Sequence, residues 1–426
     1  MRRVLMAVVL SALLNGMALA QPEDPSPLPA EVVAAWEKAG AEAGWMEPDD
    51  LNFRRGENGM PAEIPAFRLK AWQAGLLNKL PSPGQKFGLD LSDTPTDAGL
   101  KELAGFTQLQ SLNLSNTKVT DAGLKELAAL KQLKSLRIFA GQVTDAGAKE
   151  LAAFNQLKLL GLVYTKVTDA GMKEVARLRQ LQSLDLDGTN VTDAGLKELA
   201  ALKQLKSLSL DNASVTGSGL KELTGLEQLQ SLNLGGTSVT DAGLKGLAEL
   251  KQLRQLRLFC TKVTDTGLKE LAGLRQLQSL DLRGTPVTDA FMKDLASFKQ
   301  LKSLYFHHAK ITEAGLKELT ALKQLEDLDL SGVKMTAAGL KELAALKQLE
   351  FLNLSGAELT DVELKELAGL QQLQSLSLSN TEVTDAGLKE LAGLKLLRLL
   401  GLFKTKVTNA GVAELRKNLP ECDIMR

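Results

Sequence analysis

An aliphatic residue followed by threonine recurs every 24 residues along most of this 426-residue chain, with no insertion or deletion between thirteen successive copies. A shorter unit, LDLSDTPTDAGL at 89–100, precedes them. Such an invariant period indicates a stacked solenoid and excludes several independent globular domains over that stretch. The aliphatic positions are 119, 143, 167, 191, 215, 239, 263, 287, 311, 335, 359, 383 and 407.

Each unit predicts one short strand followed by one helix. In the unit at 109–132, LQSLNL is typical of a strand that buries Leu112 and Leu114 on one face. The TDAGLKELAAL that follows has helical spacing of its apolar residues, and Thr120 or Asp121 is expected to cap its N-terminus. A single unit buries too little apolar surface to fold alone. The strands are therefore expected to pair in parallel, with the bulkier helices outside.

A threonine two residues before the aliphatic position recurs in eight units. Its hydroxyl is expected to be buried and to bond backbone groups of the tight turn there. The eight residues are Thr117, Thr165, Thr189, Thr237, Thr261, Thr285, Thr381 and Thr405.

The pattern LxxLxLxxTxVTDAGLxxLxxL resembles the leucine-rich repeat family. It is similar to the cysteine-containing, ribonuclease-inhibitor-like branch, and to bacterial versions with threonine at the usual asparagine position. The resemblance covers about 89–424. It implies an α/β solenoid with a curved parallel β-sheet on the concave face and helices on the convex face. It also implies a protein-recognition scaffold, without naming a ligand.

The N-terminus has the pattern of a secretory signal peptide over 1–20. MRR is a positive start, VLMAVVLSALL is an apolar run, and Ala18-Leu19-Ala20 is typical of a cleavage site before Gln21. An uncleaved anchor is the alternative, but the apolar run is well short of the ~20 residues that a spanning helix needs. We expect a secreted, periplasmic or cell-surface protein with no membrane span after signal cleavage.

The two ends of the solenoid need caps, because open sheet edges invite aggregation. Residues 21–88 hold nine of the twelve prolines and all three tryptophans. They predict a helical N-terminal cap with helices over 30–45 and 64–80, and a separate functional domain is the alternative. The solenoid then spans 89–414. Residues 415–426 form a C-terminal cap, in which Cys422 and Ile424 are expected to point inward from a last short strand.

Composition narrows the choice of partner and chemistry. Lys+Arg and Asp+Glu are both 51, so the chain lacks the basic field that nucleic acid or an anionic membrane would attract. Its two cysteines lie 162 residues apart in the repeat, too far for a disulfide. The sequence carries no nucleotide-binding, metalloprotease or nucleophile motif. We expect a monomer that is not an enzyme and needs no cofactor or metal.

Candidate contact residues stand out where the outward strand positions depart from the usual Ser, Asn, Asp or Gly. Aromatic and arginine side chains are enriched in binding hot spots, so these departures favour recognition, with drift among duplicated units as the alternative. A middle cluster holds Arg257, Phe259, Asp281, Arg283, Tyr305 and His307; a second holds Arg137, Phe139, Leu159 and Val163; Phe351, Leu399 and Phe403 lie apart.

Two polar features have competing interpretations. Asp185, Asp187 and Asp211 form one acidic patch, and Asp327 and Asp329 form another. They predict polar surface or a patch for a basic partner, with calcium binding as the alternative. His307 and His308, the only histidines, are expected to point opposite ways from one strand and therefore not to share a metal.

These observations predict an exported, non-enzymatic scaffold that recognises a protein or peptide on its concave face. A structural or adhesive surface protein is the alternative. A third hypothesis follows from resemblance: similar repeats occur in F-box ubiquitin ligase subunits, and LPAEVV at 28–33 is superficially similar to an F-box start. The rest of that motif does not follow, and an export signal argues against it.

Overall fold

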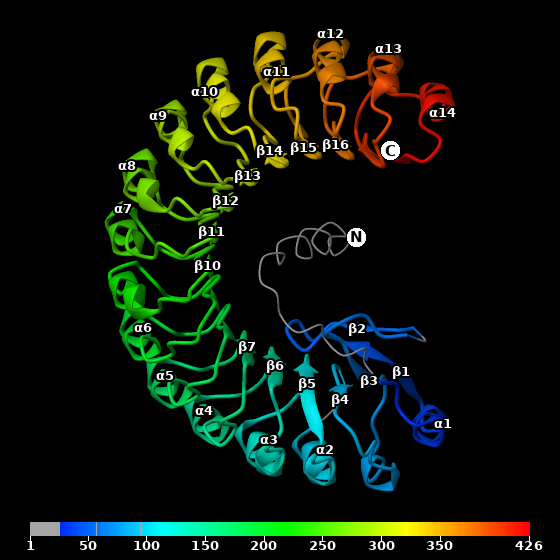
Figure 1. Cartoon of the computed structure of the whole chain (residues 1–426), viewed down its shortest axis with the longest axis vertical. Coiled ribbons are helices and arrows are strands. Elements are labelled where there is room, and N and C mark those ends of the chain that lie inside the picture. The colour runs from blue at the N-terminus through cyan, green and yellow to red at the C-terminus, as the bar shows by residue number, and fades with distance from the viewer. Residues whose placement is uncertain (1–25, 57, 94–95) are drawn as a thin grey trace.

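The computed structural model describes residues 26–56, 58–93 and 96–426. The chain forms an open arc whose strands line the inner side and whose helices line the outer side (Figure 1). The predicted α/β solenoid is confirmed. The predicted signal peptide at 1–20 lies outside the described residues. No helix in the described ranges combines the length and the apolar character needed to cross a membrane.

Eighteen strands lie within the described residues and form one continuous sheet. They are β1 (Ala41–Met46), β2 (Phe53–Arg54), β3 (Ile64–Leu69), β4 (Phe87–Asp90), β5 (Leu109–Ser115), β6 (Ser135–Phe139), β7 (Leu159–Val163), β8 (Ser183–Asp185), β9 (Ser207–Ser209), β10 (Ser231–Asn233), β11 (Gln255–Arg257), β12 (Ser279–Asp281), β13 (Ser303–Tyr305), β14 (Asp327–Asp329), β15 (Phe351–Asn353), β16 (Ser375–Ser377), β17 (Leu399–Gly401) and β18 (Asp423–Met425).

The sheet keeps the register that the repeat dictates. From β3 onwards each strand pairs in parallel with the next one, and from β5 to β18 every paired residue lies 24 positions further along. The register shifts between Phe87 and Gly88, in the shorter first unit. β1 pairs antiparallel with both β2 and β3.

The convex side carries short α-helices, many of which tighten into 3₁₀ helices before they end. The α-helices are α1 (Ala30–Lys38), α2 (Asp97–Lys101), α3 (Asp121–Glu126), α4 (Asp145–Leu151), α5 (Asp169–Val175), α6 (Asp193–Leu199), α7 (Asp241–Leu244), α8 (Asp265–Lys269), α9 (Asp289–Met292), α10 (Glu313–Glu318), α11 (Ala337–Leu343), α12 (Asp361–Leu364), α13 (Asp385–Leu388) and α14 (Asn409–Asn418). The 3₁₀ helices are η1 (Leu77–Lys79), η2 (Glu102–Gly105), η3 (Leu127–Ala129), η4 (Leu220–Gly225), η5 (Lys245–Leu247), η6 (Glu270–Gly273), η7 (Asp294–Ser297), η8 (Leu319–Ala321), η9 (Lys365–Gly369) and η10 (Lys389–Gly393).

The Thr-Asp pair of each unit links two neighbouring units. The Asp121 carboxylate accepts hydrogen bonds from the Thr144 amide at 2.8 Å and the Thr144 hydroxyl at 2.7 Å. That hydroxyl accepts in turn from the amide of Ala146, and so caps its own helix. Threonine is therefore the cap and aspartate the link to the next unit. The link recurs from Asp97, Asp145, Asp169, Asp193, Asp241, Asp265, Asp289, Asp361 and Asp385.

The glycine of TDAG makes room for this link. A Cβ at Gly147 would lie 2.4 Å from Asp121 Oδ1, closer than any real contact. The glycine is required by the approach of the preceding unit's carboxylate.

The turn threonines make the predicted backbone bonds, and all of them except the half-buried Thr405 are buried. Thr117 Oγ1 donates to the Leu114 carbonyl at 2.8 Å, and Thr285 Oγ1 donates to the Leu282 carbonyl at 2.6 Å. The other six make the same bond to the residue three positions earlier.

The N-terminal cap corrects the sequence prediction of an all-helical cap. Only the first half of the helix predicted over 30–45 forms, because α1 ends at Lys38 and Gly40 turns the chain with a φ of 89°. The helix predicted over 64–80 is instead strand β3, which is paired on both sides, with only the single turn η1 near its end. Pairing with distant strands overrode the local helical pattern. Trp36 of α1 stacks on Phe67 at 4.2 Å between ring centroids and seals the end of the core.

The hairpin of β1 and β2 folds back over the inner face of the first units (Figure 1). Leu159 of β7 packs in one small apolar cluster with Met46, Leu51 and Ala66. A Cβ at Gly88 would lie 2.8 Å from the Met46 sulfur. The beginning of the concave face is therefore already covered by the chain itself.

At the other end, β18 pairs in parallel with β17. Cys422 and Ile424 are buried there. Cys260 and Cys422 are both free thiols.

Candidate protein-binding surface

The middle cluster lies on three successive strands, β11 to β13. Arg257, Asp281 and Tyr305 are direct partners in the sheet register. Phe259, Arg283 and His307 follow two residues later in the same three units. Each of these six residues except Asp281 is at least partly exposed. The sheet therefore brings together the group that the sequence predicts.

Arg283 is the centre of the cluster. Its guanidinium donates to both carboxylate oxygens of Asp281, at 2.9 Å from Nε and 2.5 Å from Nη2. It also lies 5.7 Å from the ring centroid of Phe259 and 5.6 Å from that of Tyr305. The two hydrogen bonds to Asp281 hold the guanidinium beside both aromatic rings, and they also raise the pKa of Arg283.

Asp281 is not itself a contact residue, which corrects the prediction for that position. It is 2% exposed, and its carboxylate is used by Arg283. Its role is to position the guanidinium. The ring of Phe259 packs against the backbone of Gly235. A Cβ at Gly235 would lie 2.2 Å from two carbons of this ring, so the close packing requires glycine there.

Tyr305 extends the cluster to the next strand. Its hydroxyl donates a short hydrogen bond to Asp327. Burial, reinforced by the charge of Asp327, raises the pKa of Tyr305 above its usual range. Burial likewise raises the pKa of Asp327 to about 6, against the hydrogen bond from Tyr305.

The two histidines correct the expectation that they diverge. Both are exposed, and their ring centroids lie only 4.0 Å apart. Strand alternation ends before this point, since β13 ends at Tyr305 and His308 has a left-handed φ of 55°. His307 Nδ1 is 2.7 Å from the Ser331 hydroxyl. Among the described residues, no group of three or more His, Cys, Asp or Glu side chains is placed to hold a metal.

Most residues of the second cluster are buried or engaged in contacts with other parts of the same chain. Leu159 and Val163 are buried, which removes both from the accessible surface and corrects their prediction as contacts. Arg137 forms an ion pair with Asp50 of the β1–β2 connection, at 3.5 Å. Phe139 packs edge-on against Tyr164 at 5.5 Å, and it is only partly exposed.

The remaining predicted residues do not join either cluster. Phe351 is half-buried on β15. Phe403, just after β17, is 44% exposed and is among the most exposed large apolar side chains of the described chain. Leu399 is partly exposed on β17.

Three aspartates lie on the inner face ahead of the middle cluster. Burial, and then the neighbouring charge of Asp187, raises the pKa of Asp185 to about 7. The same two causes raise the pKa of Asp211 to about 6, although Arg257 opposes them. The Asp187 carboxylate accepts from the Ser209 hydroxyl at 2.5 Å and the Asp211 amide at 2.8 Å.

A column that sequence reasoning missed lies at the end of each strand. The three outward positions of each unit are those equivalent to Ser111, Asn113 and Ser115, and the residue directly after the third has φ between 51° and 70° in all thirteen 24-residue units. Eight units place glycine or asparagine there, the residues that tolerate this conformation. The sequence signal that could have revealed this column is a Gly or Asn that recurs at 24-residue spacing. The exceptions are Ala140, Tyr164, Cys260, His308 and Lys404.

The exceptions coincide with the bulky outward residues. Each of the five directly follows an aromatic or aliphatic residue at the third outward position: Phe139, Val163, Phe259, His307 and Phe403. The eight glycine or asparagine units have Ser, Asp, Gly or Arg there. The third outward column and the left-handed column therefore depart from the repeat pattern in the same five units. Independent drift of each column would not produce this coincidence.

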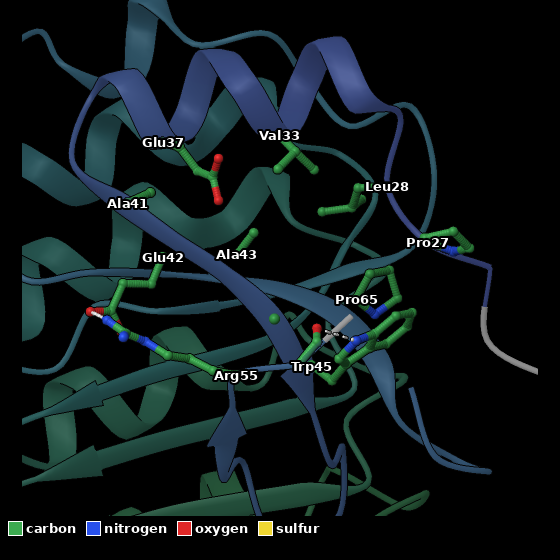
Figure 2. A pocket seen from close by; sticks show the side chains of 12 residues that line it. Pro27, Leu28, Val33, Glu37, Ala41, Glu42, Ala43, Trp45, Arg55 and Pro65 are labelled. Carbon is green, nitrogen blue, oxygen red and sulfur yellow. Dashed lines mark hydrogen bonds and ion pairs between the residues drawn. The ribbon is translucent and has the colours of Figure 1, made fainter. Parts of the chain in front are cut away.

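A separate hollow of about 660 Å³ lies in the N-terminal cap, between α1 and β1. Its lining is mostly apolar, with Leu28, Val33 and Trp45 among the residues drawn in Figure 2. At its edge Glu42 pairs with Arg55, whose hydrogen bond lowers the pKa of Glu42 to about 2. The carboxylate of Glu42 and the guanidinium of Arg55 thus neutralise one another at this edge.

Comparison with known proteins agrees with the architecture. Residues 141–273 match a family model described as leucine-rich repeat region, and residues 107–128 and 370–392 match one described as leucine rich repeat. With the fold, these matches define the class: the chain is a leucine-rich repeat protein. Comparison with curated proteins gives no match.

Three solved structures illustrate the likeness. A leucine-rich repeat protein of Leptospira interrogans is 25% identical, with a TM-score of 0.51 over 84% of this chain and 100% of that one. A TLR13–ssRNA13 complex is 18% identical, with a TM-score of 0.51 over 83% of this chain and 58% of that one. A TDR receptor is 18% identical, with a TM-score of 0.50 over 79% and 58%. The latter two show the fold alone.

Proposed function

We propose that this protein is an exported, non-enzymatic, monomeric scaffold that recognises a protein or peptide through the middle cluster of its concave face. The observation that carries the proposal is the placement of Arg283. Its cation is held between Phe259 and Tyr305 by a buried aspartate, before any partner arrives. Side chains ordered in advance lose less entropy on binding, which is how a recognition surface gains affinity.

Three further observations support this proposal. Leucine-rich repeat folds are commonly used for protein–protein recognition. The middle cluster lies clear of the β1–β2 hairpin that covers the first units. The inner face also carries six aspartates across β8 to β15. Its many aspartates would repel a phosphate backbone, which disfavours nucleic acid as a partner.

The test combines partner capture with stability. The triple variant Arg257→Ala, Phe259→Ala and Tyr305→Ala should lose capture of the partner that the wild-type protein retrieves from the secreted fraction of its own cells. The variant should remain folded, with a single cooperative thermal transition, although loss of the Tyr305–Asp327 hydrogen bond lowers its melting temperature. A control variant, Ser375→Ala, Ser377→Ala and Ser379→Ala, alters the three outward positions of the unit that contains β16 and should keep capture intact.

The measured quantity is the Kd for the partner, once it is identified by mass spectrometry and purified. An unchanged Kd in the folded triple variant would overturn the middle cluster as the binding surface. Export is tested separately by N-terminal sequencing of the mature protein, which should begin at Gln21. A mature protein that retains Met1 in the cytosol would overturn export.

A further inference from the structure

The unpartnered inner face is acidic, although the chain as a whole is neutral. Across β8 to β15, the three outward columns hold six aspartates and two arginines, with no lysine or glutamate. The aspartates are Asp185, Asp187, Asp211, Asp281, Asp327 and Asp329. A concave face lined by one sign of charge concentrates the field that acts on an approaching partner.

The two arginines leave this imbalance in place. Arg283 is neutralised by its paired bonds to Asp281. Arg257 acts on Asp211 through its charge, and lowers the pKa of that carboxyl, but the two do not form an ion pair. Within the described residues, none of the other five aspartates forms an ion pair with a lysine or arginine. The face therefore has a deficit of positive charge.

The unpaired aspartates form two groups, one on each side of the aromatic cluster. Asp185, Asp187 and Asp211 lie on and after β8 and β9, before Phe259. Asp327 and Asp329 lie on β14, directly after Tyr305 of β13. We name these two groups the first and second acidic patches. The order along the inner face is thus acidic, aromatic, acidic.

The distance between the two acidic patches determines how long a bound segment must be to reach both. From β9 to β14 there are five strand-to-strand steps, or about 24 Å at ~4.8 Å for each step. An extended chain covers about 3.3–3.6 Å for each residue, so about seven residues bridge the two patches. A side chain at the middle of such a segment would meet Phe259 and Tyr305.

We propose that the inner face binds an extended basic–apolar–basic segment of a partner protein, with its two cationic ends on the two acidic patches and its apolar residue on Phe259 and Tyr305. This inference rests on the proposed function and adds the chemistry of the partner. Burial is the main cause that raises the pKa values of Asp185, Asp211 and Asp327, and a cationic partner close to these carboxyls would lower them.

The test uses the full chain and three synthetic, fluorescently labelled peptides of equal length. The first has Lys-Arg at both ends and tryptophan at the centre. In the second, glutamates replace the basic residues; in the third, glycine replaces tryptophan. We expect fluorescence anisotropy to show binding of the first peptide, about tenfold weaker binding of the third, and none of the second. Affinity for the first peptide should fall as salt is added.

Matched charge variants locate the binding. Asp327→Asn with Asp329→Asn should weaken the first peptide about tenfold and reduce its salt dependence. Glu126→Gln with Glu270→Gln removes the same charge from exposed residues of the convex side and should leave Kd unchanged. Melting temperatures confirm that each variant is folded.

The outcomes separate the two proposals. Tighter binding of the acidic peptide, equal binding to the Asn variant, or self-association that excludes every peptide would overturn the basic–apolar–basic partner. If no peptide binds while the alanine triple variant still loses its natural partner, the proposed function stands and only the partner's chemistry falls. If the natural partner is retained by the triple variant, both fall.

Discussion

Glu363 accepts hydrogen bonds from both the backbone amide and the hydroxyl of Thr360, at 2.8 and 2.7 Å. In most other units an aspartate of the preceding unit accepts these two bonds. Here the preceding unit has Ala337 at the aspartate position, and Glu363 stands where most units have glycine. Two departures from the repeat, 26 residues apart, thus compensate for one another.

This compensation is testable as an exchange. Glu363→Gly should lower the free energy of unfolding by about 1–2 kcal/mol, because Thr360 loses the acceptor of a capped helix end. Adding Ala337→Asp should recover most of that loss, since the new carboxylate can approach a glycine as it does elsewhere. Urea denaturation of both single variants and the double variant measures the coupling. A double variant no more stable than Glu363→Gly would contradict the exchange.

Replacing two different glycines by alanine should have opposite effects. At Gly147 a Cβ would strike Asp121 Oδ1, so Gly147→Ala should cost about 1–3 kcal/mol. At Gly393, which ends η10, a Cβ would meet nothing within 4 Å. Gly393→Ala should therefore stabilise the protein by about 0.4–1 kcal/mol by restricting the unfolded chain. Thermal unfolding of the two variants decides the matter, and shifts of the same sign would refute it.

The left-handed column makes a further prediction. Lys404 has a φ of 55°, a conformation that costs an ordinary residue about 1–2 kcal/mol relative to glycine. Lys404→Gly should therefore raise stability by about 1 kcal/mol, after the greater entropy of unfolded glycine is allowed for. The matched control is Gly356→Ala, where φ is 70° and the change should be destabilising. Equilibrium unfolding in urea measures both.

Stability should fall as pH rises through the range in which the buried inner-face carboxyls ionise. Asp185, which faces Asp187 and Arg137, has its pKa raised to about 7, so the folded state holds a proton that the unfolded state has released. By linkage, the free energy of unfolding declines from near the ordinary aspartate pKa of ~3.9 up to about pH 7.

Removing the Asp185 charge should abolish part of that decline. Asp185→Asn keeps the bond from the Asp187 amide and should stabilise the protein by roughly 2–4 kcal/mol above about pH 7, with little effect at low pH. Unfolding curves at a series of pH values give the slope directly. A slope identical to that of the wild type would rule out Asp185 as its source.

The sequence was sufficient for the solenoid because its information is local and repeated. A 24-residue period with Leu112 and Leu114 in one unit predicts the buried face of every unit. The turn threonines follow for the same reason, since Thr117 bonds a carbonyl only three residues away. The composition of the middle cluster was equally visible, because the register fixes which residues become neighbours.

What the sequence did not predict depends on contacts between distant segments. β3 was mistaken for helix because its partners, β1 and β4, are chosen by the fold rather than by IPAFRL itself. Burial of Leu159 required knowing that the hairpin folds back over β7. The cross-unit bond of Asp121 to Thr144 was missed because a capping rule considers one helix at a time. The convergence of His307 and His308 arises from a backbone φ that alternation does not describe.

The constant length of the unit fixes the distances between equivalent residues on the inner face. From β5 to β18, equivalent side chains of different units are separated by whole strand steps of about 4.8 Å, because successive strands pair at a constant offset of 24 residues. Gain or loss of one unit between β11 and β12 would lengthen or shorten the gap between the acidic patches by that increment and by no other. Under the proposed binding mode, a change in the number of units between the two acidic patches would require a partner segment of a correspondingly different length.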